Sequence, residues 1–208
     1  MADTSILWLR RDLRIHDHPA LIAALESAEQ VLPVFVVDQR IWGGPWGSAD
    51  RTRFALESLA ELRAAFEARG GRLAVRQGNP ADVIPALAFE LGAKEVHATS
   101  DAAPFALARD ADVGVALEAV GSKLIRHPGA YCADIGRIAT KEGKPYTVFS
   151  PFARNWSEAE RRPLLAAPDR VSSPEIEDGA IPTVEELGMK LVLTDPLPAG
   201  EAAARARM

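Results

Sequence analysis

Three short segments of the sequence bring together arginine, carboxylate and aromatic side chains. They are residues 10–14, 38–53 and 99–105. Arginine binds carboxylates and phosphates through paired hydrogen bonds, and indole rings offer flat surfaces for stacking. A flat heterocycle with an anionic tail would suit such a set. The candidate ligand-binding residues are Arg10, Arg11, Asp12, Asp38, Trp42, Trp46, Arg51, Asp101 and Phe105.

Most of these candidates also have a purely structural interpretation. Arg10 and Asp12 could pair with each other or cap the following helix. Asp101 could be a turn or N-cap residue. Trp42 and Trp46 flank a Gly-Gly-Pro loop and could cover the edge of the core. Both interpretations stay open at this point.

The residues of the sequence favour neither a metal site nor a catalytic centre. His16 and His18 are two apart, but they fall in a loop beside a helix start, and no third ligand is evident. Cys132 is the only cysteine, which excludes an internal disulfide and a Cys-built metal site. His97 is expected in a strand or the core and His127 in a loop. No Ser/His/Asp arrangement or carboxylate pair stands out, so we expect a binding site without bond-breaking chemistry.

Short apolar runs alternate with amphipathic helical stretches, which is typical of parallel βαβ units. Trp8 lies in the first run and is expected in the core. Pro33 lies in the second run and is expected at the start of a strand or at a bulge, because proline cannot donate to a ladder. The predicted strands span residues 5–9, 31–37, 72–75, 95–98 and 123–125.

Helix signals separate these strands. A helix is expected from Pro19, and another carries apolar residues at helical spacing with Ser48 or Asp50 as its cap. Asn79-Pro80 and Gly92 are typical of the start and end of a third. A fourth helix precedes the last strand, and shorter ones are expected near residues 151–160 and 201–208.

The fold class predicted from this order is α/β, a Rossmann-like doubly wound parallel sheet of five strands in the order 3-2-1-4-5. Ligands of such sheets lie beyond the carboxyl ends of the strands, where the strand order reverses. The three candidate segments would meet there. Because the sequence contains neither GxGxxG after the first strand nor GxxxxGK[ST], the ligand must be held by other loops.

We divide the chain into three parts. Residues 1–130 form the α/β core, residues 131–163 add loops and a short helix to the same domain, and residues 164–208 have the Pro, Ser, Asp and Glu content of a linker. The last helix looks cut short, so more protein is expected beyond it. The first apolar segment, residues 5–9, is too short for a signal peptide and is flanked by polar residues.

The overall charge argues against a dedicated nucleic-acid surface. The formal net charge is −5, whereas domains that bind a phosphate backbone usually carry a basic face. No apolar run approaches the length of a membrane span. A cytoplasmic protein with a small anionic or aromatic ligand fits best.

Two motifs resemble the signatures of the photolyase and cryptochrome family. Residues 8–14 (WLRRDLR) and 16–21 (HDHPAL) resemble its opening signature, with His18 where the family usually has Asn. Residues 143–152 (GKPYTVFSPF), with Arg154 and Trp156, resemble its second signature. An intermediate motif includes Asp101, Pro104, Phe105, Arg109 and Asp110.

The resemblance implies the N-terminal, antenna-chromophore-binding domain of a DNA photolyase. In such enzymes a separate helical domain binds FAD and damaged DNA, and reduced FAD repairs a pyrimidine dimer flipped from the duplex. That domain would be the main partner of this chain, with DNA bound through it and no membrane involved. The parent protein would be a carbon-carbon lyase, but this chain alone would not repair DNA and carries no catalytic residue.

The resemblance also implies a set of chromophore contacts. Arg51 and Asp101 correspond to antenna contacts of deazaflavin-binding relatives, and Arg11 and Asp38 lie on loops that flank the same cleft. Trp42 and Phe105 complete the predicted set. Ala102 and Ala103 stand where folate-binding relatives place a Glu, which favours a deazaflavin or flavin over a folate. Ala103 also lacks an acidic contact that some deazaflavin-binding relatives have, so the antenna stays open among deazaflavin, flavin and none.

Three other functions stay open. A cryptochrome photoreceptor shares the N-terminal half, and only the missing half would separate it from a photolyase. A free-standing nucleotide- or flavin-binding protein would have a similar sheet, although such proteins often carry a glycine-rich phosphate loop. An interaction module that has lost its pigment is the third.

Overall fold

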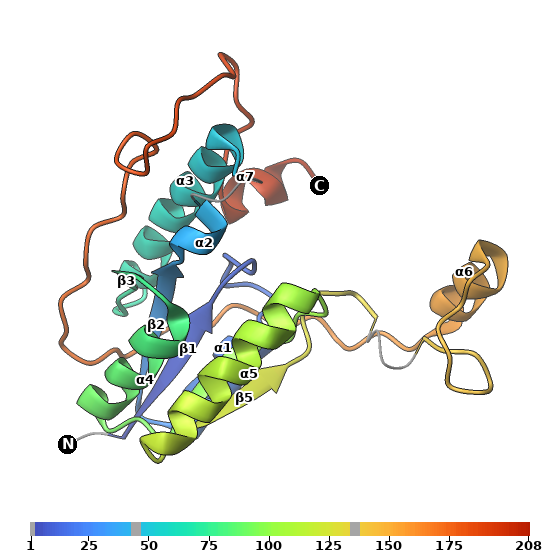
Figure 1. Cartoon of the computed structure of the whole chain (residues 1–208), viewed down its shortest axis with the longest axis horizontal. Coiled ribbons are helices and arrows are strands. Elements are labelled where there is room, and N and C mark those ends of the chain that lie inside the picture. The colour runs from blue at the N-terminus through green and yellow to red at the C-terminus, as the bar shows by residue number, and fades with distance from the viewer. Residues whose placement is uncertain (1–2, 43–46, 134–137) are drawn as a thin grey trace.

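The computed structural model describes residues 3–42, 47–133 and 138–208 (Figure 1). Five strands form one parallel sheet in the order β3-β2-β1-β4-β5, which confirms the predicted topology. The strands are β1 (Thr4–Leu9), β2 (Gln30–Val37), β3 (Ala74–Gln77), β4 (Glu95–Thr99) and β5 (Lys123–His127). β1 is central and fully buried, as expected of an apolar parallel strand covered on both faces.

Helices cover both faces of the sheet. α1 (Pro19–Ser27) and α3 (Ala49–Glu67) pack on one face, while α4 (Pro80–Leu91) and α5 (Pro104–Ala119) pack on the other. Alternate residues of β1 divide between the two layers: Leu7 and Leu9 join the first core, whereas Ile6 and Trp8 join the second. Trp8 is 1% exposed, in agreement with the core position expected for it.

Helix termini follow the cap signals in part. The Asn79 side chain accepts a hydrogen bond from Ala81 N–H at the start of α4, and Gly92 ends that helix in the left-handed conformation. His18 caps α1 by accepting from Leu21 N–H. Ser48 occupies the N-cap of α3, but its side chain forms no capping hydrogen bond.

Pro33 corrects one expectation, because it lies inside β2 opposite Leu7 rather than at the start of the strand. Val31 bonds to the C-terminal segment through Ser172 and Ser173 on the side away from β1. Pro33, two residues on, faces the same side. β3 pairs with β2 only from Val34 onward, so the missing N–H of Pro33 removes no ladder bond.

Other element boundaries differ by a few residues from the predictions. β3 begins two residues later than expected, because Arg72 N–H and the Arg72 guanidinium bind Ser173 and Asp178 of the C-terminal segment instead of pairing with β2. A short helix that the sequence did not predict, α2 (Gln39–Trp42), follows β2 directly. The Asp38 carboxylate accepts from Arg40 N–H at its start.

Residues 164–199, here called the C-terminal strap, have little regular secondary structure and run as a long loop past β3 and α3 (Figure 1). Hydrogen bonds of Ser172, Ser173 and Asp178 attach the strap to the α/β core. Val171 is 1% exposed and belongs to the first core, where its side chain lies against Gly71. Val75 N–H donates to Asp178 O, which extends the hydrogen bonding of β3 outward. The strap therefore covers the β3 edge of the sheet, which would otherwise be open.

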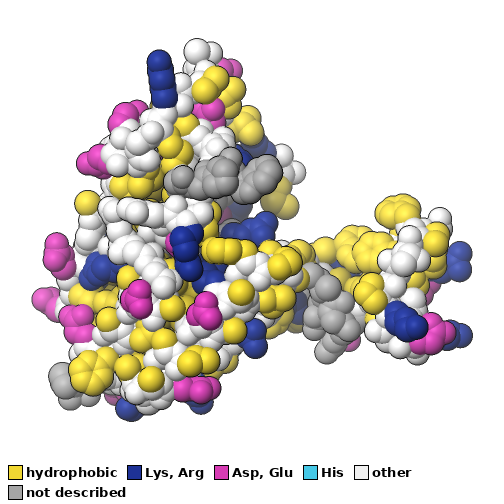
Figure 2. All heavy atoms as spheres, viewed as in Figure 1, with side chains coloured by type: hydrophobic (Ala, Val, Ile, Leu, Met, Phe, Trp, Pro, Cys, Tyr) yellow, Lys and Arg dark blue, Asp and Glu magenta, His cyan; other side chains and the backbone are white. Residues whose placement is uncertain are grey.

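A helix that stands away from the rest of the domain, α6 (Phe149–Glu158), overlaps the short helix predicted near residues 151–160 but begins two residues earlier. In the space-filling view, apolar side chains gather on the part of this region that faces the rest of the domain, while charged side chains lie at its outer end (Figure 2). Val148 and Phe149 are exposed, and Trp156 is partly covered by the Arg161 guanidinium. The chain returns to the core where Arg162 pairs with Asp17.

Candidate functional site

A cavity of about 940 Å³ lies beyond the carboxyl ends of β1 and β2. It is bounded by the loop after β1, by α2 and α3, by the start of α5, and by α7 (Glu201–Ala206). The three candidate segments thus meet, as the topology predicts. The cavity is lined by all six side chains of the predicted chromophore set, namely Arg11, Asp38, Trp42, Arg51, Asp101 and Phe105.

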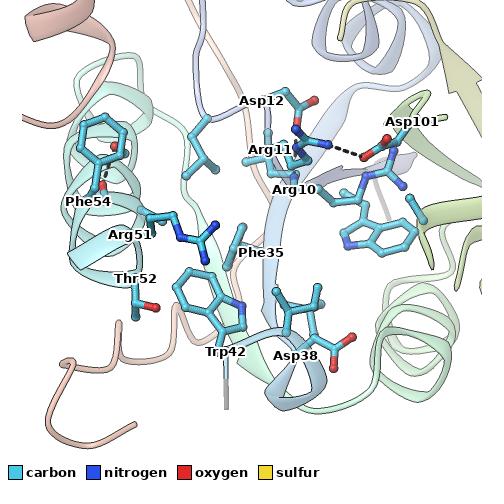
Figure 3. Close-up of a pocket in the computed structure, with 18 of the residues that line it drawn as sticks. Arg10, Arg11, Asp12, Phe35, Asp38, Trp42, Arg51, Thr52, Phe54 and Asp101 are labelled. Carbon is cyan, nitrogen blue, oxygen red and sulfur yellow. Dashed lines mark hydrogen bonds and ion pairs between the residues drawn. The ribbon is translucent and has the colours of Figure 1, made fainter. Parts of the chain in front are cut away.

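Arg11 and Asp101 face each other on one side of this cavity (Figure 3). Arg11 Nη1 lies 3.4 Å from Asp101 Oδ2, and the arginine side chain is largely exposed while Asp101 is largely covered. Burial acts to raise the pKa of Asp101, but hydrogen bonding from Ala103 N–H and the nearby Arg11 guanidinium hold it below its ordinary value. Asp101 is therefore both a turn residue and an anionic group at the cavity wall.

Arg10 has a different partner from the one proposed from its spacing. Its guanidinium binds Asp110 of α5 at 2.7 Å, and only its backbone N–H donates to Asp12. Arg109 binds the same Asp110 oxygen, and the guanidinium groups of Arg10 and Arg109 lie 4.6 and 4.9 Å from the centre of the Trp8 ring. This buried group forms the floor of the cavity and joins β1 to α5.

Asp38 and Trp42 take positions set by α2. Arg40 binds both oxygens of Asp38, at 2.9 and 2.6 Å. This hydrogen bonding is the main cause of the raised pKa of Arg40. The Asp38 carboxylate points away from Arg51 (Figure 3), so it orients α2 more directly than it faces the cavity. Trp42 packs edge-on against Phe35, with ring centroids 5.9 Å apart. Trp46 lies outside the described residues.

α3 supplies the opposite wall. Arg51 extends from this helix toward Phe35 and Trp42, and Phe54 lies one turn further along (Figure 3). Phe105 is about half exposed at the rim, where the Arg40 guanidinium lies 5.5 Å from its ring. The cavity thus combines aromatic surfaces with arginines on two sides, which suits a planar anionic molecule.

Several lining residues were not predicted from the sequence. They include Phe35, Arg40, Thr52, Phe54, Ser58 and Glu201. The seven-residue spacing of Arg51 and Ser58 could have placed Ser58 on the cavity-facing side of α3, because residues seven apart share one face of a helix. Glu201 carried no such signal, because its contact with the loop after β1 spans 186 positions of sequence.

The histidines have structural partners. His16 binds Glu201, and His18 lies 3.1 Å from Asp12. His127 ends β5, rather than lying in a loop, and stacks on His97 with Nε2 2.9 Å from His97 Nδ1. Among the described residues, no group of three or more His, Cys, Asp or Glu side chains is arranged to hold a metal ion.

Residues 5–171, most of the chain, match the model of the family described as DNA photolyase. The chain belongs to the DNA photolyase family. The resemblance carried by the two signature motifs is thereby confirmed, and so is the N-terminal position of this domain in its relatives.

Curated relatives include both named branches of this family. The "Uncharacterized 31.6 kDa protein in atpI 5'region" of Synechococcus sp. (strain PCC 6716) is 35% identical over 96% of this chain and 71% of its own length. The Cryptochrome DASH of Natronomonas pharaonis is 34% identical over 93% of this chain and 42% of its own length. A Deoxyribodipyrimidine photo-lyase of Synechococcus sp. (strain ATCC 27144) is 30% identical over the whole chain and 45% of its own length.

A solved structure supports the same relationship. A bacterial class III photolyase from Agrobacterium tumefaciens superposes with a TM-score of 0.77 at 29% identity, over 90% of this chain and 38% of that one. This photolyase-family domain therefore spans less than half the length of the named photolyases and cryptochrome that it matches. In the described part of the chain, none of the helices has the length and apolar content of a membrane span.

Proposed function

We propose that this chain is the light-harvesting-cofactor-binding domain of a deoxyribodipyrimidine photolyase. The observation that carries the proposal is the 940 Å³ cavity, in which aromatic surfaces and two arginine-bearing walls converge without a glycine-rich phosphate loop. Pockets of this size and composition accommodate a molecule as large as a tricyclic chromophore. When bound, such a chromophore absorbs light and passes the excitation to a flavin.

The residues present suit a flat, anionic ligand. Trp42 and Phe35 offer an apolar surface beside the cavity, and Arg51 extends along it. Arg11 and Asp101 would bind polar groups at the opposite wall. Phe105 would cover the rim, while Asp38 would act through Arg40 and α2. Ala103, which lines the cavity, offers no carboxylate to a folate-type antenna, so a deazaflavin or flavin is the favoured class.

The FAD and the damaged DNA of the whole enzyme would be bound by a further helical domain, for which this domain is the partner. Within residues 3–42, 47–133 and 138–208 we identify no candidate for bond-breaking chemistry. The purified 208-residue chain, supplied with FAD, a reductant and light, should therefore leave thymine dimers unrepaired. Repair above the level of free flavin would contradict this part of the proposal.

The binding test uses flavin mononucleotide (FMN) and 8-hydroxy-5-deazariboflavin as separate probes. Binding of each probe is measured by fluorescence titration. We expect saturable binding of one or both. Arg51→Ala and Asp101→Ala should each weaken it about tenfold or more, since one charge-assisted hydrogen bond contributes about 1.5–3 kcal/mol. Glu118→Ala, an exposed position near the other end of α5, is the control. Unchanged affinity in both site variants would refute the site.

A cryptochrome-type photoreceptor is the second candidate, favoured by the 34% identity to a Cryptochrome DASH. It would use the same cavity for its antenna. The two functions would be separated by joining the domain to the proposed helical FAD-binding domain and assaying dimer repair, because only a photolyase would restore the bases.

A further inference from the structure

The last helix of the chain forms part of the cavity. Gly200, Glu201 and Ala204 line it. α7 lies beside α3 at the end of the C-terminal strap (Figure 1). Residues 200–204 thus belong to the cavity wall, although they lie far from Arg51 in the sequence.

α7 is bound to α3 by its first turn. Gly200 N–H donates to Ser58 Oγ at 3.1 Å, and the Glu61 carboxylate accepts from Glu201 N–H and Ala202 N–H at 3.0 and 3.3 Å. A carboxylate at this position binds the free N–H groups of a helix start. Gly200 has φ +92°, which favours glycine, and a Cβ there would lie 2.8 Å from Glu61 Oε2, so a larger residue would displace the Glu61 carboxylate.

The Glu201 side chain reaches across to the loop after β1. Its Oε2 accepts from Ile15 N–H at 2.8 Å, and its Oε1 accepts from His16 N–H at 3.1 Å and lies 3.0 Å from His16 Nδ1. Arg205 contacts the other ring nitrogen of His16. The same loop carries Arg11 and Arg14, both of which line the cavity.

We propose that Glu201 is a positioning residue of the pigment site, and that residues 200–204 form the wall that completes it. Glu201 connects the two sides of the cavity, because its backbone is held by α3 and its carboxylate holds the loop that carries Arg11. The identity of the ligand rests on the proposed function; the positioning of the loop does not. Ligand binding and the docking of α7 stabilise each other, since both require the same spacing of α3 and the loop.

The test compares Glu201→Gln with Glu185→Gln, an exposed glutamate of the strap, in the full 208-residue chain. The amide introduced by Glu201→Gln can accept at one oxygen only and places an NH₂ group against the N–H groups of Ile15 or His16. Without any ligand, amide exchange at Ile15 and His16 should become about tenfold faster in Glu201→Gln and stay unchanged in Glu185→Gln. Unchanged exchange in Glu201→Gln would overturn the positioning role.

Ligand titration supplies the second measurement, with FMN as the probe, or 8-hydroxy-5-deazariboflavin in its place if the unmodified chain binds only that probe. Glu201→Gln should weaken FMN binding at least fivefold, and FMN should slow amide exchange at Glu201 and Ala202 of the unmodified chain. Ala204→Trp, which places an indole at the wall, should weaken binding without changing the melting temperature. It also keeps the test decisive if Glu201→Gln folds poorly. If both variants bind the ligand as tightly as the unmodified chain does, the proposal that residues 200–204 form a wall of the pigment site is overturned.

The two proposals fail in different ways. If the unmodified chain binds neither FMN nor the deazaflavin, the proposed function is lost. The positioning role is then judged by exchange at Ile15 and His16 alone.

Discussion

The Asp12 carboxylate lies 3.1 Å from Nε2 of His18, and both side chains are buried where β1 leads into α1. His18 Nδ1 accepts from Leu21 N–H, so its proton is on Nε2, facing Asp12, although the contact is angled away from ideal hydrogen-bond geometry. Burial acts to raise the pKa of Asp12, but His18, Thr99 and Arg10 N–H together hold it well below its ordinary value. One histidine thus caps a helix with one ring nitrogen and faces a buried carboxylate with the other.

Replacing His18 should separate these two roles. His18→Ala removes the cap and the partner of Asp12, and we expect it to lower the free energy of unfolding by about 2–4 kcal/mol. His18→Asn keeps a good capping group but is too short to reach Asp12, so it should cost about 1–2 kcal/mol. Urea denaturation at pH 7 measures both. Equal losses in the two variants would mean that the cap contributes nothing.

Stability should fall as the pH is lowered from about 6.5, because of His97 and His127. Burial lowers the pKa of both imidazoles below the ordinary value of 6.5. Well above that pH both are neutral in either state; below it, the unfolded chain takes up protons that the folded chain resists. Asp12 and Asp17, whose pKa values are lowered, lose their contribution only in more acidic solution.

The measurement is urea unfolding at intervals from about pH 8 to about pH 5, which brackets the ordinary imidazole pKa. The double variant His97→Asn with His127→Asn should flatten the decline. A decline of the same slope in this variant would assign the effect to other groups.

Asp110 should be among the most sensitive polar positions of the domain. Its Oδ1 binds Arg10 and Arg109, and these three side chains are 1%, 8% and 9% exposed. Asp110→Ala would leave two buried guanidinium groups without their carboxylate, which costs about 3–5 kcal/mol. Asp112→Ala, at an exposed site on the same helix, should change the free energy of unfolding by less than about 0.5 kcal/mol. Thermal and urea unfolding of the pair test this; similar values would contradict it.

Two glycines of the strap offer a matched test of how tightly it binds. Gly179 has φ +72°, and a Cβ there would lie 2.2 Å from Val75 O, whereas Gly188 has φ +73° and open space around it. Gly188→Ala should therefore cost only the strain of a left-handed alanine, about 1 kcal/mol. Gly179→Ala should cost about 2 kcal/mol more, because the strap must move away from β3.

Urea unfolding measures these losses in Gly179→Ala and Gly188→Ala. Trypsin cleavage at Arg76 and Arg170 gives a second readout for the same two variants. Faster cleavage is expected in Gly179→Ala only. Equal rates in the two variants would show that the strap does not depend on this close approach.

From the sequence alone, the alternation of apolar runs with helical stretches and the caps at Asn79 and Gly92 predicted the α/β class and the strand order. The two signature motifs predicted the family. These features are local or periodic, so they can be recognised in the sequence without knowing which distant residues are in contact. They also sufficed to bring Arg11, Arg51 and Asp101 to one end of the sheet, because parallel topology places all loops after the strands on that side.

Only the tertiary structure decided which of these side chains are already engaged. Arg10 binds Asp110 rather than nearby Asp12, and Asp38 is held by Arg40. The contacts of the strap and α7 with the core are the largest group that the sequence did not predict. The binding of Glu201 to Ile15 and His16, for example, links opposite ends of the chain. Such pairs form only when the layers of the fold pack together, so neither the spacing of residues nor the composition predicts which distant side chains will meet.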